Sequence, residues 1–334
     1  MRTNKLCPFI LSSGMIFLSI IINPECRIVN KFSVDYFLPV CYTSRWIFQE
    51  GEFKMSAFSL MLNQILSFIF AVVLIPFSAL THGIDLISVD GRTDTAKTNV
   101  VGIGAYFRSQ GMTSDGETLY FSSKTTVIRT EADAKTLINA NYSAIPDELK
   151  DLGIKHIGGL SCYNGYIYAG LEDSKVWDYP IVGIYDAQTL ELVDYYIMDS
   201  EKITRGLPWV CVNSENGYLY CTDHSKNPTK LLVYDTAKEM AFVEEVMLES
   251  SPYAIQGAEF YNGKIYAATN DDTQAIYIID PVTGGDEKLL DRNLTGGSEG
   301  EGMTFIIRDG KPVLTAMDMG PLFINAFVRE YPFE

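Results

Sequence analysis

Gln110-Gly-Met-Thr-Ser-Asp-Gly-Glu-Thr-Leu-Tyr-Phe, residues 110–121, is the first of five related stretches in this chain of 334 residues. The other four open at Gly158-Gly159, Pro208-Trp209, Gln256-Gly257 and Glu301-Gly302. The second residues of these openings, 111, 159, 209, 257 and 302, are 48, 50, 48 and 45 positions apart. Self-similarity at this interval is typical of repeat architectures.

Each opening leads through a short apolar run and a polar turn into a second apolar run. The turns begin Asp115-Gly, Asn164-Gly, Asn216-Gly, Asn262-Gly and Asp309-Gly. Asn-Gly and Asp-Gly between apolar runs are a strong hairpin signal, because glycine accepts the positive φ of a primed turn. Every repeat is therefore expected to begin with a two-stranded hairpin.

A third and a fourth strand follow in the middle repeats. Apolar runs from 181, 231 and 275 end in Asp186, Asp235 and Asp280, where the carboxylate can cap following backbone amides. Outer strands are expected at 191–197, 242–247 and 287–290. Four antiparallel strands in each of five repeats predict an all-β chain folded as a five-bladed β-propeller, with six blades as the alternative.

Two segments complete this expectation. Residues 84–89 (IDLISV) are strand-like and are expected to close the ring as the outer strand of the last blade. In the first repeat, 131–139 and 145–152 have helical patterns, and Pro146 suits a first helical turn. A sandwich of two sheets is the other all-β option, but it does not predict a repeated glycine opening.

The N-terminal region is expected to lie outside the propeller, which is assigned to 84–334. Residues 55–84 carry no Asp, Glu, Lys or Arg, and an apolar helical core at 65–77 leads to small residues around 79–83. This pattern predicts a signal peptide over 55–83, with an uncleaved membrane anchor as the alternative. Residues 1–54 are interpreted as a gene-model extension, or else as a membrane or unstructured segment. The propeller is thus expected to be secreted, or anchored on the exported side.

The charge of the chain limits its partners. The formal net charge is −16, and from residue 84 onward 20 basic and 38 acidic residues give −18. A surface this acidic repels phosphate backbones and excludes nucleic acid as a partner. Contact with a membrane is expected only through 55–83, if that segment is not cleaved.

The repeats resemble a broad superfamily of propellers that includes NHL-repeat proteins, calcium-dependent lactonases and paraoxonases, and glutaminyl cyclotransferases. The resemblance covers about 100–330 and is carried by Gln110-Gly-Met with Leu119-Tyr-Phe-Ser and by Ile276-Tyr-Ile-Ile-Asp-Pro-Val-Thr-Gly. It implies the fold. The cyclotransferases have a catalytic Glu where this chain has Phe121-Ser122-Ser123, which argues against that reaction here. Glu301 resembles a calcium ligand of the lactonases, whose other ligands have no clean match.

Inner strands of a propeller begin around one axial opening, so the residues at and just before the repeated position should converge there. This places the candidate binding residues Arg108, Gln110, Gln256 and Glu299 around one channel mouth, together with the candidate catalytic residues His156 and Glu301. His156 beside carboxylates could act as a general base. Glu301 with further oxygens could hold Ca²⁺. Glu172-Asp173 is expected to be a solvated loop.

Two functions remain open from these residues. One is a module that binds a small molecule or a protein at the channel mouth; the alternative is a calcium-dependent hydrolase of the lactonase, esterase or phosphatase kind. Asn141 and Asn293 stand in sequons and predict surface glycosylation if the chain is exported through a glycosylating pathway. Cys211 and Cys221 flank a hairpin one residue out of register, so buried thiols are expected there, with a disulfide as the alternative.

Overall fold

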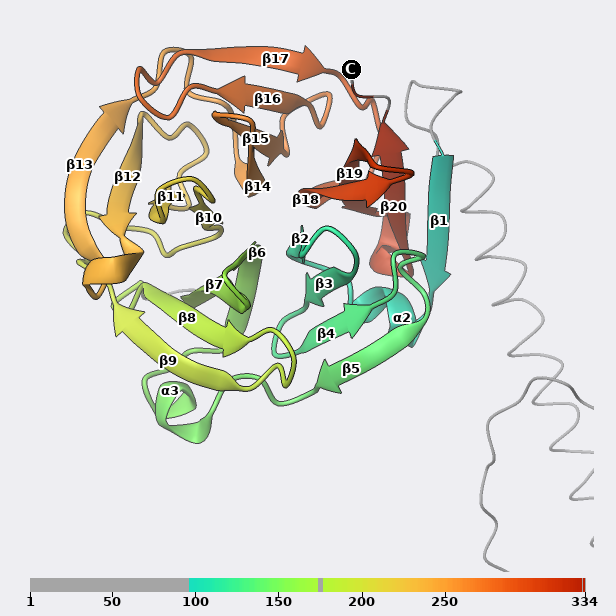
Figure 1. The fold of residues 1–334 in the computed structure, drawn as a ribbon, viewed down its shortest axis with the longest axis horizontal. Coiled ribbons are helices and arrows are strands. Elements are labelled where there is room, and N and C mark those ends of the chain that lie inside the picture. Colours follow the sequence, from blue (N-terminus) through green and yellow to red (C-terminus); the bar gives the residue numbers. More distant parts are fainter. Residues whose placement is uncertain (1–95, 174–176, 332, 334) are drawn as a thin grey trace, which may run out of the picture. The chain divides into compact units, whose positions relative to one another are not determined.

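The computed structural model describes residues 96–173, 177–331 and 333. Within these residues, the strands form five antiparallel sheets of four strands each, arranged as blades around one axis (Figure 1). The protein is an all-β, five-bladed β-propeller, as the repeat predicts, and the alternatives of six blades or a sandwich are wrong.

Blades 1 to 4 run outward from the axis in chain order (Figure 1). Blade 1 contains β2 (Met112–Ser114), β3 (Leu119–Ser122), β4 (Val127–Thr130) and β5 (Leu137–Asn141). Blade 2 contains β6 (His156–Tyr163), β7 (Tyr166–Glu172), β8 (Ile181–Asp186) and β9 (Leu192–Ile197). Blade 3 contains β10 (Cys211–Val212), β11 (Tyr218–Cys221), β12 (Lys230–Asp235) and β13 (Ala241–Met247). Blade 4 contains β14 (Ile255–Tyr261), β15 (Lys264–Thr269), β16 (Ile276–Ile279) and β17 (Asp286–Leu290).

Blade 5 is assembled from both ends of the described chain. Its first three strands are β18 (Glu299–Arg308), β19 (Lys311–Met319) and β20 (Asn325–Tyr331), and its outer strand is β1 (Ala96–Val101), which pairs antiparallel with β20. The prediction of an N-terminal closing strand is therefore right in topology, but its position at 84–89 is wrong. Those residues have the stronger strand propensity, yet the run that pairs with β20 is 96–101, which is separated from β2 by α2.

Three of the five predicted hairpin turns have positive φ at both central residues, whereas at Asp115-Gly116 and Asn216-Gly217 only the glycine has it. Asn164-Gly165, Asn262-Gly263 and Asp309-Gly310 have positive φ at both central residues, with values of 50° and 80°, 48° and 77°, and 51° and 74°. Type I′ turns require this geometry, and their twist matches that of the flanking strands. The dipeptides thus fix the register of β6 with β7, of β14 with β15 and of β18 with β19.

The aspartates that end the third strands act as caps. Asp186 Oδ1 accepts hydrogen bonds from the backbone N–H groups of Gln188 and Thr189 at 2.9 and 2.7 Å. Asp280 Oδ1 accepts from Val282 and Thr283, both at 2.9 Å. These Asx turns reverse the chain into the outer strand of each blade.

The connections between strands contain short helices. These are α2 (Ile103–Tyr106), α3 (Asp147–Asp151), η1 (Thr236–Lys238) and η2 (Pro321–Phe323). The predicted helix within 145–152 is present as α3, which follows Pro146. The predicted helix at 131–139 is wrong, because Asp133 caps a turn to Lys135 and Thr136 and the chain continues as β5.

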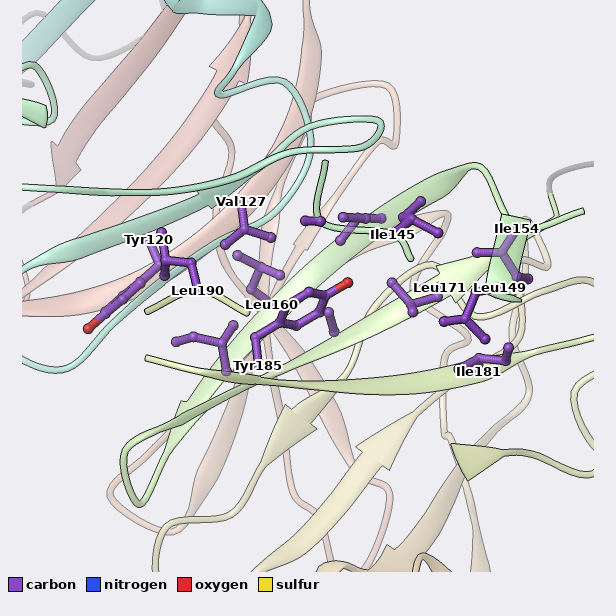
Figure 2. Packing of buried hydrophobic residues seen from close by; sticks show 14 of the residues in the cluster. Tyr120, Val127, Ile145, Leu149, Ile154, Leu160, Leu171, Ile181, Tyr185 and Leu190 are labelled. Carbon is purple, nitrogen blue, oxygen red and sulfur yellow. The ribbon is translucent and has the colours of Figure 1, made fainter. Parts of the chain in front are cut away.

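The core lies between adjacent blades. One cluster joins blades 1 and 2: Tyr120 and Val127 of blade 1 pack toward Leu160, Leu171 and Tyr185 of blade 2, all buried (Figure 2). Ile145, Leu149 and Ile154, in and beside α3, cover the edge of this cluster (Figure 2). Each blade therefore buries its faces only against its neighbours, which makes ring closure a condition for a dry core.

The predictions for 1–54 and 55–83 fall outside the described residues. Among the helices that the structure describes, none has both the length and the apolar character needed to cross a membrane.

Candidate functional site

The inner strands meet at the axis through four glycines. A Cβ added to Gly302 would lie 2.2 Å from the backbone nitrogen of Met112, and one added to Gly257 would lie 2.8 Å from the Cα of Gly302. A Cβ on Gly111 would lie 2.8 Å from the Cα of Gly159, and one on Gly159 would lie 2.8 Å from the Cβ of Trp209. We call these four glycines the axial glycine ring. The repeated positions thus share one centre, and no side chain larger than hydrogen fits at these four.

The remaining repeated position, the third in chain order, is occupied by Trp209. It is fully buried, and its indole Nε1 donates a hydrogen bond to Thr222 Oγ1 at 3.0 Å. β10 contains only two residues, Cys211 and Val212, so this inner strand begins later than the others. The segment before it therefore approaches the axis as an extended loop, and Pro208 lies at the channel mouth.

A cavity opens at the mouth of the axis, where the inner strands begin. It has a volume of about 140 Å³ and is lined by Gln110, His156, Gly159, Pro208, His224, Gln256, Glu299 and Glu301. Since a water molecule takes up about 30 Å³ of liquid, the cavity has room for roughly four or five waters. Five of the six residues predicted at the channel mouth line it, contributed by blades 1, 2, 4 and 5.

Arg108 is the predicted residue that does not line this cavity. Its Nε donates to the carbonyl of Ala134 at 2.8 Å and its Nη1 to the carbonyl of Gly104 at 2.7 Å, while the guanidinium lies 5.4 Å from the ring of Phe121. It serves to hold α2 and the β4–β5 turn together. The arginine is two residues ahead of Gln110 but belongs to the α2 segment rather than to a strand, so the alternation that the prediction assumed does not apply.

Glu301 is the most unusual group in the cavity. Only 3% of it is exposed, and its carboxylate has no hydrogen-bond or ion-pair partner among the described residues. Burial, together with the nearby charges of Glu299 and Asp318, raises its pKa well above the usual range, and Arg292 opposes this only in part. A buried carboxylate costs free energy unless it is paired or protonated.

Glu299 lies two residues earlier on the same strand and faces the same space. Its Oε1 accepts a hydrogen bond from Asn270 Nδ2 at 3.1 Å, and Asn270 Oδ1 accepts from the backbone N–H of Gly300 at 3.2 Å. The Asn270 side chain therefore fixes the entry of β18 and holds Glu299 at the cavity wall. Two carboxylates, one anchored and one unpartnered, then mark the blade 5 side of the cavity.

Two histidines share one buried carboxylate on the blade 2 and blade 3 side. Glu172, 2% exposed, lies 3.3 Å from His156 Nδ1 through Oε2 and 3.7 Å from His224 Nδ1 through Oε1. His156 Nε2 also shares a hydrogen bond with Gln110 Oε1 at 2.8 Å. Burial favours a higher pKa for Glu172, but its pairing with both histidines outweighs this and lowers the pKa, and the same contact raises the pKa of His224.

Glu172 and Asp173 were expected in a solvated loop, and that expectation is wrong, since both are buried. The hairpin around Asn164-Gly165 places Glu172 directly opposite His156 in the register of β6 and β7. A plain count outward from the turn brings the end of β7 opposite His156 but pairs it with Asp173. The β-bulge between Ile157 and Leu160 shifts the register by one residue, so the observed pair does not follow from the count. His224 follows β11 at the same end of blade 3.

A second polar layer lies beneath the axial glycine ring, two residues further along each inner strand. It consists of Thr113, Ser161, Cys211, Glu259 and Thr304, all buried. Glu259 Oε2 accepts hydrogen bonds from the hydroxyls of Thr113 at 2.9 Å and Thr304 at 3.0 Å. Burial raises the pKa of Glu259 to about 7, against the effect of those hydroxyls. We call these five residues the axial polar layer.

The axial polar layer also joins neighbouring blades. Thr113 Oγ1 accepts from the backbone N–H of Cys162 and Ser161 Oγ accepts from that of Val212, both at 2.9 Å. Each of these hydroxyls therefore satisfies a backbone donor of the next inner strand, which would otherwise be buried without a partner. Glu259 is the acidic member of the layer, and its charge adds to the burial that raises the pKa of the Cys211 thiol.

A calcium site at Glu301 finds limited support in the residues present. Within the described part of the chain, no group of three or more His, Cys, Asp or Glu side chains is arranged to hold a metal ion. Ca²⁺ normally takes six to eight oxygen ligands. Here Gln110 Oε1 is engaged by His156 and Glu299 Oε1 by Asn270. The donor set does not fit a calcium centre, and no chemical step is derived through one.

The predicted modification sites differ in their surroundings. Asn293 is exposed in the loop between β17 and β18. Asn141 is half-buried, and its Nδ2 donates to the carbonyl of Leu190 at 2.8 Å. Cys162, Cys211 and Cys221 are free thiols, and Cys211 pairs opposite Tyr220 rather than Cys221, which leaves the two cysteines one residue out of register.

No protein-family model matches this chain, and no curated protein matches it significantly. Among solved structures, it is similar to hydrazine synthase of Kuenenia stuttgartiensis, with 14% identity over 64% of this chain and 56% of that chain and a TM-score of 0.37. It is also similar to Sqt1 of Saccharomyces cerevisiae, with 12% identity over 65% of this chain and 55% of that chain and a TM-score of 0.35. A chain of the mitotic checkpoint complex has 11% identity over 66% of this chain and 72% of that chain, with a TM-score of 0.36.

The chain spans a little over half the length of the first two of these structures. The assignment as a propeller rests on the protein's own five sheets.

Proposed function

We propose that this protein is a ligand-binding module that takes a small molecule into the axial cavity at the channel mouth. The observation that supports this most strongly is Glu301, a carboxylate that is 3% exposed, borders the cavity and has no partner among the described residues. Charged groups in such positions are costly to the fold and are typical of sites that interact with something else.

The rest of the cavity fits this role. Its polar groups come from five blades, and several are held in place by neighbours: Glu299 by Asn270, and His156 by Glu172 and Gln110. Small-molecule sites combine a largely preformed concave surface with a few polar groups that fix orientation. Because the axial glycine ring lies at the base of the cavity, we infer that a ligand enters and leaves through the mouth.

The test is a thermal melt of the purified protein in the presence of small organic cations, neutral amides and polyols, and organic anions. A ligand that binds only the native state adds RT ln(1 + [L]/Kd), about 2.7 kcal/mol at a hundredfold excess over Kd. Gln256→Phe should fill the cavity and abolish the stabilisation. Gln188→Phe, an exposed position on the β8–β9 turn, is the matched control and should keep it. If no class of compound stabilises the wild type, the proposal fails.

Export of the propeller is a separate part of the proposal. It rests on the charge-free apolar segment within 55–84 and on the acidic character of the rest of the chain. N-terminal sequencing of the mature protein would distinguish a cleaved signal peptide from a retained anchor. A mature N-terminus within 1–54 would contradict the interpretation of that region as a gene-model extension.

A further inference from the structure

We propose that the ligand of the axial cavity is a small organic cation, a protonated amine, held by Glu301 and Glu299. This inference rests on the proposed ligand-binding function and adds the chemical class of the ligand.

The charges that line the cavity are unbalanced. Among the residues that border the cavity, two are carboxylates, two are histidines already facing the buried carboxylate of Glu172, and none is Lys or Arg. The negative side of the cavity, formed by Glu299 and Glu301, therefore lacks a positive counterpart. A cationic ligand would supply it.

The arginine that opposes the rise in the pKa of Glu301 is Arg292, in the loop before β18, and each of its three nitrogens already contacts another group. Its Nη2 contacts Asp318 Oδ1 at 2.7 Å, its Nε donates to the Tyr331 hydroxyl at 2.9 Å, and its Nη1 donates to the Met317 carbonyl at 3.2 Å. Arg292 thus belongs to a closed network behind the cavity wall and does not pair with Glu301.

The oxygens at the cavity suit an amine better than a metal ion. An ammonium group has one positive charge and a few directional N–H donors, which two carboxylates and one amide oxygen can satisfy. The cavity offers this number: Glu301, Glu299 and the side chain of Gln256, which borders the same space. A divalent ion would require several more oxygen ligands than the described residues bring together.

The size of the cavity also suits a small amine. A volume of about 140 Å³ exceeds what a single ion or water occupies, yet it is below the range of roughly 300–1,000 Å³ that is usual for drug-sized ligands. Pro208 and the backbone of Gly159 give an uncharged stretch of wall. An amine with a short carbon substituent matches this combination of one charged side and one uncharged side.

Binding of such a cation should also release a proton. Glu301 is buried against Glu299 of its own strand, Asp318 of β19 and Arg292 of the preceding loop, while His156 and His224 face the cavity from the other side. Without ligand this environment favours the protonated carboxyl of Glu301. An ammonium group favours the carboxylate instead, so binding and ionisation are coupled.

The experiment measures ethylammonium chloride binding by isothermal titration calorimetry at constant ionic strength, with acetamide and calcium chloride as comparison probes. Ethylammonium should bind the wild type and release protons, seen as a heat that depends on the ionisation enthalpy of the buffer. Glu301→Gln keeps size and shape but removes the charge, and should weaken ethylammonium binding roughly ten- to a hundredfold. Glu287→Gln, on the exposed face of β17, is the matched control and should leave the affinity unchanged.

The other outcomes separate this inference from the proposed function. Acetamide binding that is as tight as that of ethylammonium and insensitive to Glu301→Gln would overturn the amine and leave a ligand site. Stabilisation by Ca²⁺ through Glu301, with no effect of ethylammonium, would overturn it in favour of a metal. No binding of ethylammonium would overturn the amine, and the proposed function fails as well only if none of the compound classes in the thermal melt stabilises the wild type. If Glu301→Gln does not fold, Glu299→Gln is the second variant, with the same expected loss of ethylammonium affinity.

Discussion

Replacing Glu259 by glutamine should make the propeller more resistant to alkaline conditions. Glu259 belongs to the axial polar layer, and burial raises the pKa of its carboxyl from 4.5 to about 7. Since the folded state holds the proton more tightly than the unfolded chain, this group contributes full stability below about pH 4.5. The contribution falls as the pH rises toward 7 and is lost above it.

The size of the effect follows from the shift in pKa. Each unit corresponds to about 1.36 kcal/mol, so the difference between 4.5 and about 7 amounts to about 3 kcal/mol at pH 9. Glutamine keeps an acceptor oxygen for the hydroxyls of Thr113 and Thr304, which both contact Oε2, but it cannot ionise. Glu259→Gln should therefore gain about 3 kcal/mol relative to the wild type between pH 4 and pH 9, or on the order of 10 °C in Tm for a domain of this size.

The assay is urea unfolding of both proteins at half-unit intervals from pH 4 to pH 9, followed by tryptophan fluorescence. The quantity to follow is how the difference in free energy of unfolding between variant and wild type changes with pH. The cost of the extra amide N–H donors of glutamine is the same at every pH, so it cancels from this change. Glu287→Gln, exposed on β17, should show no such trend. Parallel profiles for Glu259→Gln and the wild type would refute the buried, protonated carboxyl.

Three further predictions concern the framework. Asp318→Asn should lower the free energy of unfolding in urea by about 3–5 kcal/mol, because it leaves two buried guanidinium groups without their carboxylate. The surface control Asp280→Asn should cost about 1 kcal/mol or less. Gly302→Ala should lower the free energy of unfolding by about 1–3 kcal/mol or more, because its Cβ would lie 2.2 Å from a backbone atom. The control Gly296→Ala meets nothing within 4 Å and should lie within about 0.5 kcal/mol of the wild type. Equal melting temperatures of the two variants would contradict the close approach at the axis. The buried Cys211 thiol should react with a thiol reagent only as fast as the propeller unfolds, and fast labelling of the native protein would contradict its burial.

The blades were predictable because their signals are local. An Asn-Gly pair such as Asn164-Gly165 specifies a turn by backbone sterics alone, and an aspartate such as Asp186 caps the next turn with its own side chain. The closing strand depends instead on a partner 226 residues away, as in the hydrogen bond from Asn325 Nδ2 to Asn99 Oδ1 at 2.9 Å. The local pattern favours the more strand-like run at 84–89, so it does not identify 96–101 as the closing strand.

The cavity residues that precede or begin the inner strands were predictable. Gln110, His156, Gln256 and Glu301 follow from the register of the repeat, because equivalent positions meet at the axis. Glu172 is the last residue of β7 and His224 lies in the loop after β11, and at both places burial depends on how neighbouring blades pack. The sequence also does not predict that Glu301 is unpaired among the described residues, because this depends on Arg292 contacting Asp318 instead.

The pairing of β1 with β20 determines how the fold would respond to a pulling force. Ala96 lies opposite Glu330 and Val101 opposite Asn325, so the first and last described strands leave their ladder at the same end. Tension applied between the two ends of this domain would load the hydrogen bonds one after another, as in a zipper, instead of all together in shear. Opening of this seam under tension would expose the faces of blade 5 first.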